Sequence, residues 1–92
     1  MNEYSYSIEK KLKARLKRTY KKDKKLYDVV TKKIEEIINN PFHYKPLKHD
    51  LKGLRRVHLV KSFVLVFDID EEEKKVRFLD LDHHDEIYRK KY

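Results

Sequence analysis

Two stretches of the chain carry apolar residues at helical spacing. In the first stretch the apolar positions recur at every fourth residue: Ile8, Leu12, Leu16 and Tyr20. In the second stretch they lie one to four residues apart: Leu26, Val30, Ile34, Ile37 and Ile38. This spacing predicts two amphipathic helices. We expect Ser7 to cap the first helix and Asp23 to cap the second. The second helix should run to about Asn39, because Pro41 cannot continue it.

Strand-like patterns flank the two predicted helices. Residues 3–7 alternate around two tyrosines, residues 54–60 alternate between basic and apolar side chains, and residues 63–69 are mostly apolar. A fourth strand is expected from residue 75 to about 82. The order strand, helix, helix and three strands (βααβββ) predicts a single α+β domain over residues 1–92. We expect an antiparallel helix pair packed on one sheet face, an antiparallel three-strand meander, and a short C-terminal helix or tail.

The predicted hairpin of residues 54–69 joins a basic strand to an apolar one. Arg56 and His58 lie two residues apart, so both point to the same face of a strand. An arginine can bind a phosphate through two hydrogen bonds, and an imidazole exchanges protons near neutral pH. The pair therefore suits cleavage of a phosphodiester by a ribose 2′-hydroxyl, a reaction that requires no metal. A solvated basic strand face is the alternative interpretation.

The charge balance of the chain favours an anionic partner. The 92 residues include 24 Lys and Arg against 16 Asp and Glu, which gives a net charge of +8. Such an excess favours a polyanion or an acidic protein as partner. A lysine-rich thermophilic surface would explain the high charge content, but not its positive sum. The absence of Cys excludes disulfides and thiolate metal sites. No apolar run approaches the roughly 20 residues of a membrane span, so we expect a cytoplasmic protein without a membrane partner.

A second cluster of chemically active residues lies near the C-terminus. His83 and His84 are flanked by Asp82 and Asp85, which suggests a metal site at first sight. Adjacent residues of a strand point to opposite faces, however, so we expect no metal and no other cofactor. One of the two histidines is better suited to contact a phosphate. Tyr88 can either stack on a nucleobase or pack the C-terminal segment onto the sheet.

Several segments together resemble one known family. They are Ile37-Ile38-Asn39-Asn40-Pro41, Tyr44-Lys45-Pro46-Leu47-Lys48, Leu51-Lys52-Gly53-Leu54-Arg55-Arg56-Val57, and the ending from His83 through Tyr88. In this combination the chain resembles the RelE/ParE superfamily of toxins from toxin-antitoxin systems, and most closely the RelE-type mRNA interferases. The resemblance implies a metal-independent endoribonuclease that enters the ribosomal A site and cuts the mRNA there. It also implies an acidic, mostly helical RelB-like antitoxin that neutralises the toxin, and promoter DNA bound by the pair.

The resemblance also assigns roles to individual residues. Arg56, His58 and Tyr88 match catalytic positions of the family. The expected RNA contacts are Lys45, Lys48, Lys52, Arg55, Lys61, His83 and His84. Val64 and His84 stand where the family usually has arginines, so Lys61 or Arg55 is expected to compensate. Two alternatives within the superfamily remain: a ParE-like inhibitor of DNA gyrase, and a catalytically weakened member that mainly binds its antitoxin.

Overall fold

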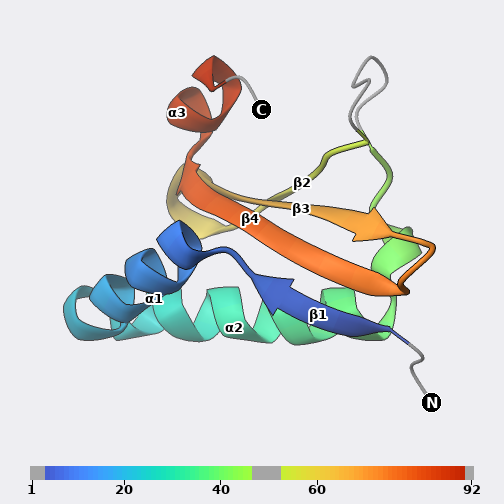
Figure 1. The fold of residues 1–92 in the computed structure, drawn as a ribbon. Coiled ribbons are helices and arrows are strands. Elements are labelled where there is room, and N and C mark those ends of the chain that lie inside the picture. The colour runs from blue at the N-terminus through green and yellow to red at the C-terminus, as the bar shows by residue number, and fades with distance from the viewer. Residues whose placement is uncertain (1–3, 47–52, 91–92) are drawn as a thin grey trace.

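The computed structural model describes residues 4–46 and 53–90, and it contains a four-stranded sheet in the order β1-β4-β3-β2. Strand β1 (Ser5–Ile8) runs parallel to β4 (Lys75–His83). Strand β3 (Phe63–Asp70) runs antiparallel both to β4 and to β2 (Arg55–His58). Two long helices lie below the sheet in Figure 1, and one short helix stands above it. The α+β architecture predicted from the sequence is confirmed.

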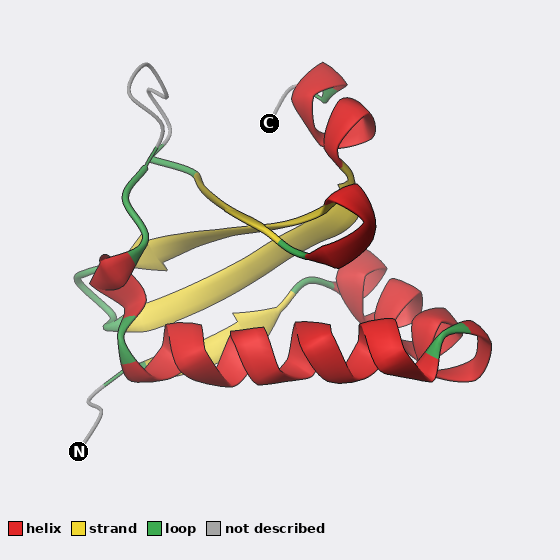
Figure 2. Ribbon diagram, turned by 180° about the vertical axis from the view of Figure 1, so that it is seen from behind, coloured by secondary structure: helices red, strands yellow, loops and turns green. Residues whose placement is uncertain are grey.

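The two long helices form the pair that the apolar spacing predicts. Helix α1 (Lys10–Lys22) buries Leu12 and Leu16, and α2 (Lys24–Asn39) buries Leu26, Val30, Ile34 and Ile37. Figure 2 shows α2 lying along the sheet. Asp23 caps α2 as predicted, because its Oδ1 accepts a hydrogen bond of 3.1 Å from the backbone N–H of Leu26.

The predicted cap of the first helix is wrong. Ser7 lies within β1, and α1 begins three residues later, at Lys10. The reason is the pairing of β1 with β4, which continues through Ile8 opposite Phe78. The backbone N–H of Glu9 still donates to the carbonyl of Phe78 at 2.9 Å, so the chain leaves the sheet only after that residue. Glu9 occupies the cap position without a side-chain cap bond.

Two short 3-10 helices lie in the chain before and after β2. Helix α2 ends at Asn39 as predicted, and the short 3-10 helix η1 (Pro41–His43) begins at the proline that cannot continue it. Gly53 has a φ of 69°, a left-handed conformation that glycine adopts without strain. Strand β2 covers residues 55–58 rather than the predicted 54–60, because a second 3-10 turn, η2 (Val60–Ser62), follows it. Lys61 has a φ of 57° in this turn, which is incompatible with a continuing strand.

Strand β3 is buried on both faces, which explains its unbroken apolar run. Phe63, Leu65 and Phe67 pack into the main core with α1 and α2. Val64 and Val66 face the other way and form a second, smaller cluster with Leu54 and Ile87. Ile87 belongs to α3 (His84–Arg89) and is fully buried. The predicted C-terminal helix is therefore present, and Ile87 anchors it on the sheet.

Candidate active site between strand β2 and helix α3

The register between β2 and β3 puts Arg56 and His58 on one face of the sheet. Arg56 lies opposite Val66, and His58 lies opposite Val64. Both valines belong to the small apolar cluster beneath α3. Arg56 and His58 therefore share the sheet face that carries α3, away from α1 and α2, as their spacing of two residues predicts. His58 is exposed, and Arg56 is half-buried.

Helix α3 brings two further side chains to this position. The centre of the His58 ring lies 5.5 Å from that of His84 and 6.4 Å from that of Tyr88, with only 21° between the planes of the His58 and Tyr88 rings. The His84 and Tyr88 rings are 4.5 Å apart. The guanidinium carbon of Arg56 lies 5.2 Å from the centre of the Tyr88 ring. We call Arg56, His58, His84 and Tyr88 the β2–α3 cluster.

The β2–α3 cluster combines the groups that phosphodiester chemistry requires. Arginine keeps its charge at every physiological pH and can bind two phosphate oxygens at once. Two imidazoles can accept and donate protons. Tyr88 keeps 43 % of its surface exposed, so a nucleobase can stack on its ring. The arrangement can therefore bind an anion, move protons and orient a base.

Two carboxylates lie on β4, which is separated from β2 by β3, on the same face of the sheet. Asp80 is opposite Val66 and Asp82 is opposite Val64. Lys90 reaches both carboxylates, at 2.6 Å from Asp80 Oδ2 and 3.2 Å from Asp82 Oδ2. From α1, Lys11 lies 3.4 Å from Asp80 and Arg15 lies 3.3 Å from Asp82. Lys90, Lys11 and Arg15 offset the negative charge of Asp80 and Asp82. Without them, this charge would repel a phosphate bound at the β2–α3 cluster.

The ion pairs favour the charged forms of Asp82 and Lys90. Burial by itself would raise the pKa of Asp82, but hydrogen bonds from the His83 N–H and from Lys90, together with the charge of Arg15, lower it overall. Burial likewise works to lower the pKa of Lys90, yet its hydrogen bonds to Asp80 and Asp82 raise it above the ordinary lysine value. The sequence interpretation did not include this network. The sequence does contain an indication of this network. The alternation Asp80-Leu81-Asp82 places two carboxylates on one face of a strand.

Several predicted RNA contacts lie away from the β2–α3 cluster. Arg55 is next to Arg56 in β2 and so faces α1 and α2, where its Nε donates to the Tyr44 carbonyl at 2.9 Å. Lys61 pairs with Asp23 at 2.7 Å, and the His83 ring packs 4.2 Å from that of Phe63. Each of these side chains therefore makes its contact on the side of the sheet that carries α1 and α2. We call this the helix side of the sheet.

Three predicted RNA contacts, Lys45, Lys48 and Lys52, and the position of Val64 remain to be described. Lys45 is exposed. Lys48 and Lys52 lie outside the described residues. Val64 is fully buried beneath α3, so the position at which the resemblance implies an arginine has a packing role here. Because Arg55 and Lys61 have partners on the other face, neither stands in for that arginine in this conformation.

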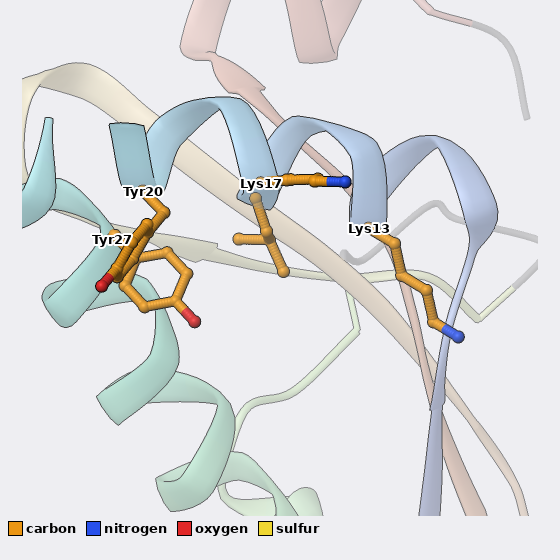
Figure 3. A pocket seen from close by; sticks show the side chains of 5 residues that line it. Lys13, Lys17, Tyr20 and Tyr27 are labelled. Atoms are coloured by element: carbon orange, nitrogen blue, oxygen red, sulfur yellow. The ribbon is translucent and has the colours of Figure 1, made fainter. Parts of the chain in front are cut away.

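A groove of about 410 Å³ between α1 and α2 is lined by Lys13, Leu16, Lys17, Tyr20 and Tyr27, and Figure 3 shows the two tyrosines against each other at its end.

Among residues 4–46 and 53–90, no three His, Cys, Asp or Glu side chains gather as metal ligands would. In the same part of the chain, no helix is long and apolar enough to span a membrane.

Comparison with known proteins places the chain in a family. Residues 6–88 match the family model described as the ParE toxin of the type II toxin-antitoxin system, parDE. A protein of Methanocaldococcus jannaschii named "Putative toxin RelE4" is 51 % identical over 88 residues, which cover 96 % of this chain and 94 % of that protein. The chain belongs to the RelE/ParE superfamily of type II toxin-antitoxin toxins. The resemblance inferred from its motifs is thereby confirmed.

Solved structures of other proteins have the same fold as this toxin. The intact RelBE toxin-antitoxin complex of E. coli matches with a TM-score of 0.70 and 16 % identity, over 87 % of this chain and 95 % of that chain. The archaeal RelE–RelB complex from Pyrococcus horikoshii matches with a TM-score of 0.60 and 12 % identity, over 91 % of this chain and 97 % of that chain. At such low identity the likeness establishes the fold alone.

Proposed function

We propose that this toxin is a ribosome-dependent, metal-independent endoribonuclease that cuts mRNA in the A site. The observation that supports the proposal is the convergence of Arg56, His58, His84 and Tyr88 on one exposed surface. These residues come from β2 and α3, which are far apart in the sequence. Their shared location is what a phosphodiester-cleaving site needs.

The cleavage step uses each group of the cluster in one role. His58 takes the proton of the ribose 2′-hydroxyl as its oxygen forms a bond to the neighbouring phosphorus. The bond from phosphorus to the 5′-oxygen breaks, and protonated His84 donates a proton to that leaving oxygen. The products are a 2′,3′-cyclic phosphate and a free 5′-hydroxyl. Arg56 neutralises the charge that builds on the phosphate oxygens, and Tyr88 stacks on a base to align the 2′-oxygen.

The wider basic surface supplies affinity that does not depend on sequence. Lys45, together with Lys48 and Lys52 of the neighbouring segment, contacts phosphates of the mRNA or of ribosomal RNA. The ribosome holds the mRNA across the open β2–α3 cluster, so the toxin needs no deep substrate groove of its own. This target places the protein in the cytoplasm.

The second partner in this proposal is an acidic, RelB-like antitoxin. The net charge of +8 favours a negatively charged partner. The E. coli and P. horikoshii structures of the same fold are complexes of RelE with RelB. We expect the antitoxin to neutralise the toxin, and the pair to bind promoter DNA through the antitoxin.

Primer extension on a translating mRNA tests the proposed activity. Purified toxin added to a reconstituted translation reaction should produce cuts within the A-site codon, each leaving a 2′,3′-cyclic phosphate. The cognate antitoxin should abolish the cuts. Folded toxin that leaves the mRNA intact would rule out the endoribonuclease proposal.

Two alternatives within the superfamily have their own support. The matching family model is that of ParE toxins, and Val64 is a buried packing residue where RelE-type enzymes usually have an arginine. Both observations favour a DNA gyrase inhibitor, which should block supercoiling by purified gyrase. A weakened member that only binds its antitoxin should neither cut RNA nor inhibit gyrase, and its expression without the antitoxin should leave cell growth unchanged.

A further inference from the structure

The position of α3 depends on its contacts with the sheet. The helix has only six residues, whereas isolated helices shorter than about 12 residues are marginal in water. Its main apolar contact is Ile87, which is fully buried against Leu54, Val64 and Val66. Apolar packing is non-directional. This contact and the direct connection of His84 to β4 hold the start and the middle of α3 on the sheet. Neither is a directional contact at the C-terminal end of the helix.

Lys90 provides a directional contact just after the helix ends. Its Nζ donates to Asp80 Oδ2 at 2.6 Å and to Asp82 Oδ2 at 3.2 Å. The Asp80 side chain is 6 % exposed, and that of Lys90 is 31 % exposed. By contrast, Arg89 is 75 % exposed and pairs with Glu86 of the same helix at 3.3 Å. The Lys90 contact is partly shielded from water and salt, whereas the Arg89 contact is an ordinary surface pair.

The contacts of Lys90 and Tyr88 lie toward different strands. Lys90 attaches the end of α3 to β4, whereas the Tyr88 ring lies beside Arg56 and His58 of β2. Figure 1 shows α3 standing above the sheet at the end of β4. With Ile87 between these two attachments, α3 is held at three points, and three points define an orientation.

We propose that Lys90 is a positioning residue whose hydrogen bonds to Asp80 and Asp82 hold α3 in the rotation that brings Tyr88 and His84 beside Arg56 and His58. Lys90 does not contact the RNA in this account. It acts through the ring arrangement of the β2–α3 cluster. The consequence for RNA cleavage rests on the proposed function, whereas the consequence for the ring contacts does not.

Ring contacts observed by NMR test the positioning role without any substrate. Lys90→Met keeps the apolar part of the side chain and removes its charged amino group, Lys90→Arg keeps the charge, and Arg89→Met is the matched control at the adjacent residue. Nuclear Overhauser effects between the His58 and Tyr88 rings should be present in the wild type, in Lys90→Arg and in Arg89→Met. They should be lost in Lys90→Met, while the amide spectrum of α2 stays unchanged.

Cleavage kinetics then test the consequence for function. With saturating ribosomes, Lys90→Met should lower the cleavage rate by about 10- to 100-fold, since a misplacement of about 1 Å can have this effect. Ribosome affinity should be unchanged, and Lys90→Arg should restore the rate.

The outcomes separate this proposal from the proposed function. Unchanged ring contacts in Lys90→Met would overturn the positioning role, and so would an equal loss in Arg89→Met. Global unfolding of both Lys90→Met and the milder Lys90→Gln would contradict a local role. If the wild type cuts no mRNA, the proposed function fails, and the NMR result alone decides the role of Lys90.

Discussion

Removing the buried side chain of Ile87 should detach α3 and leave the rest of the fold intact. The main core between the helices and the sheet does not include Ile87, which belongs to the separate cluster of Leu54, Val64 and Val66. Ile87→Ala removes three carbons from a fully buried site. At about 0.8 kcal/mol for each carbon, the lost transfer free energy is about 2.4 kcal/mol. The remaining cavity brings the total to between about 2.5 and 4 kcal/mol.

Hydrogen exchange measures this effect locally. Because about 1.4 kcal/mol corresponds to a tenfold change in an equilibrium constant, amides of α3 should exchange roughly 60- to 700-fold faster in Ile87→Ala. Amides of α2 and β3 should change little. Ile87→Val, which removes one carbon, should speed exchange in α3 by no more than about tenfold.

A core substitution provides the control for this prediction. Ile34 of α2 is almost completely buried in the main core, so Ile34→Ala should raise exchange throughout the molecule. Exchange in α3 that stays at the wild-type rate in Ile87→Ala would refute the reasoning. A rise in α2 as large as that in α3 would refute it too, since the two clusters would then unfold together.

Three further predictions concern His58, Asp82 and Gly53. His58→Gln should lower the cleavage rate and change the shape of its pH profile, because His84 then remains as the only proton-transfer group of the cluster, and an unchanged profile would exclude His58 from proton transfer. Because the folded-state pKa of Asp82 is lowered, its ionised form should contribute stability above the ordinary carboxyl value of about 3.9. That contribution is lost as the pH falls through the lower folded value. Urea midpoints of wild type and Asp82→Asn should therefore differ most near neutral pH and converge in acid, whereas a constant difference would contradict the assignment. Gly53 has a φ of 69°, and an added Cβ would meet no atom within 4 Å. Gly53→Ala should therefore lower the free energy of unfolding by about 1 kcal/mol through backbone strain alone, and Gly53→Asn by less. Equal losses in the two variants would point to another cause.

Features set by neighbouring residues could be predicted from the sequence. The Asp23 cap depends on a residue three positions away, and the shared face of Arg56 and His58 depends on the two-residue period of a strand. The buried run from Phe63 to Phe67 follows from its unbroken apolar character. In each case the physical cause lies within a few residues of the feature.

Features set by distant residues could not be predicted. The parallel pairing of β1 with β4 extends β1 through Ile8 and displaces the start of α1. The partners of Arg55 and Lys61, namely Tyr44 and Asp23, are 11 and 38 residues away. Lys90 reaches Asp80 only because α3 folds back over the sheet. Positive charge and the family resemblance suggested that Arg55 and Lys61 would join the RNA-binding face, whereas their long-range contacts hold them toward α1 and α2.

Comparison of the two sheet faces tests the central claim most directly. The measurement is single-turnover cleavage of A-site mRNA by two sets of three variants, one set for each face. One set alters the β2–α3 cluster through Arg56→Gln, His58→Gln and Tyr88→Ala. The other alters the helix side through Arg55→Gln, Lys61→Gln and His83→Ala. Each change in the cluster should lower the rate by about 100-fold or more, and each change on the helix side by less than about threefold. Equal losses on both faces, or full activity of the cluster variants, would contradict the assignment of the active surface.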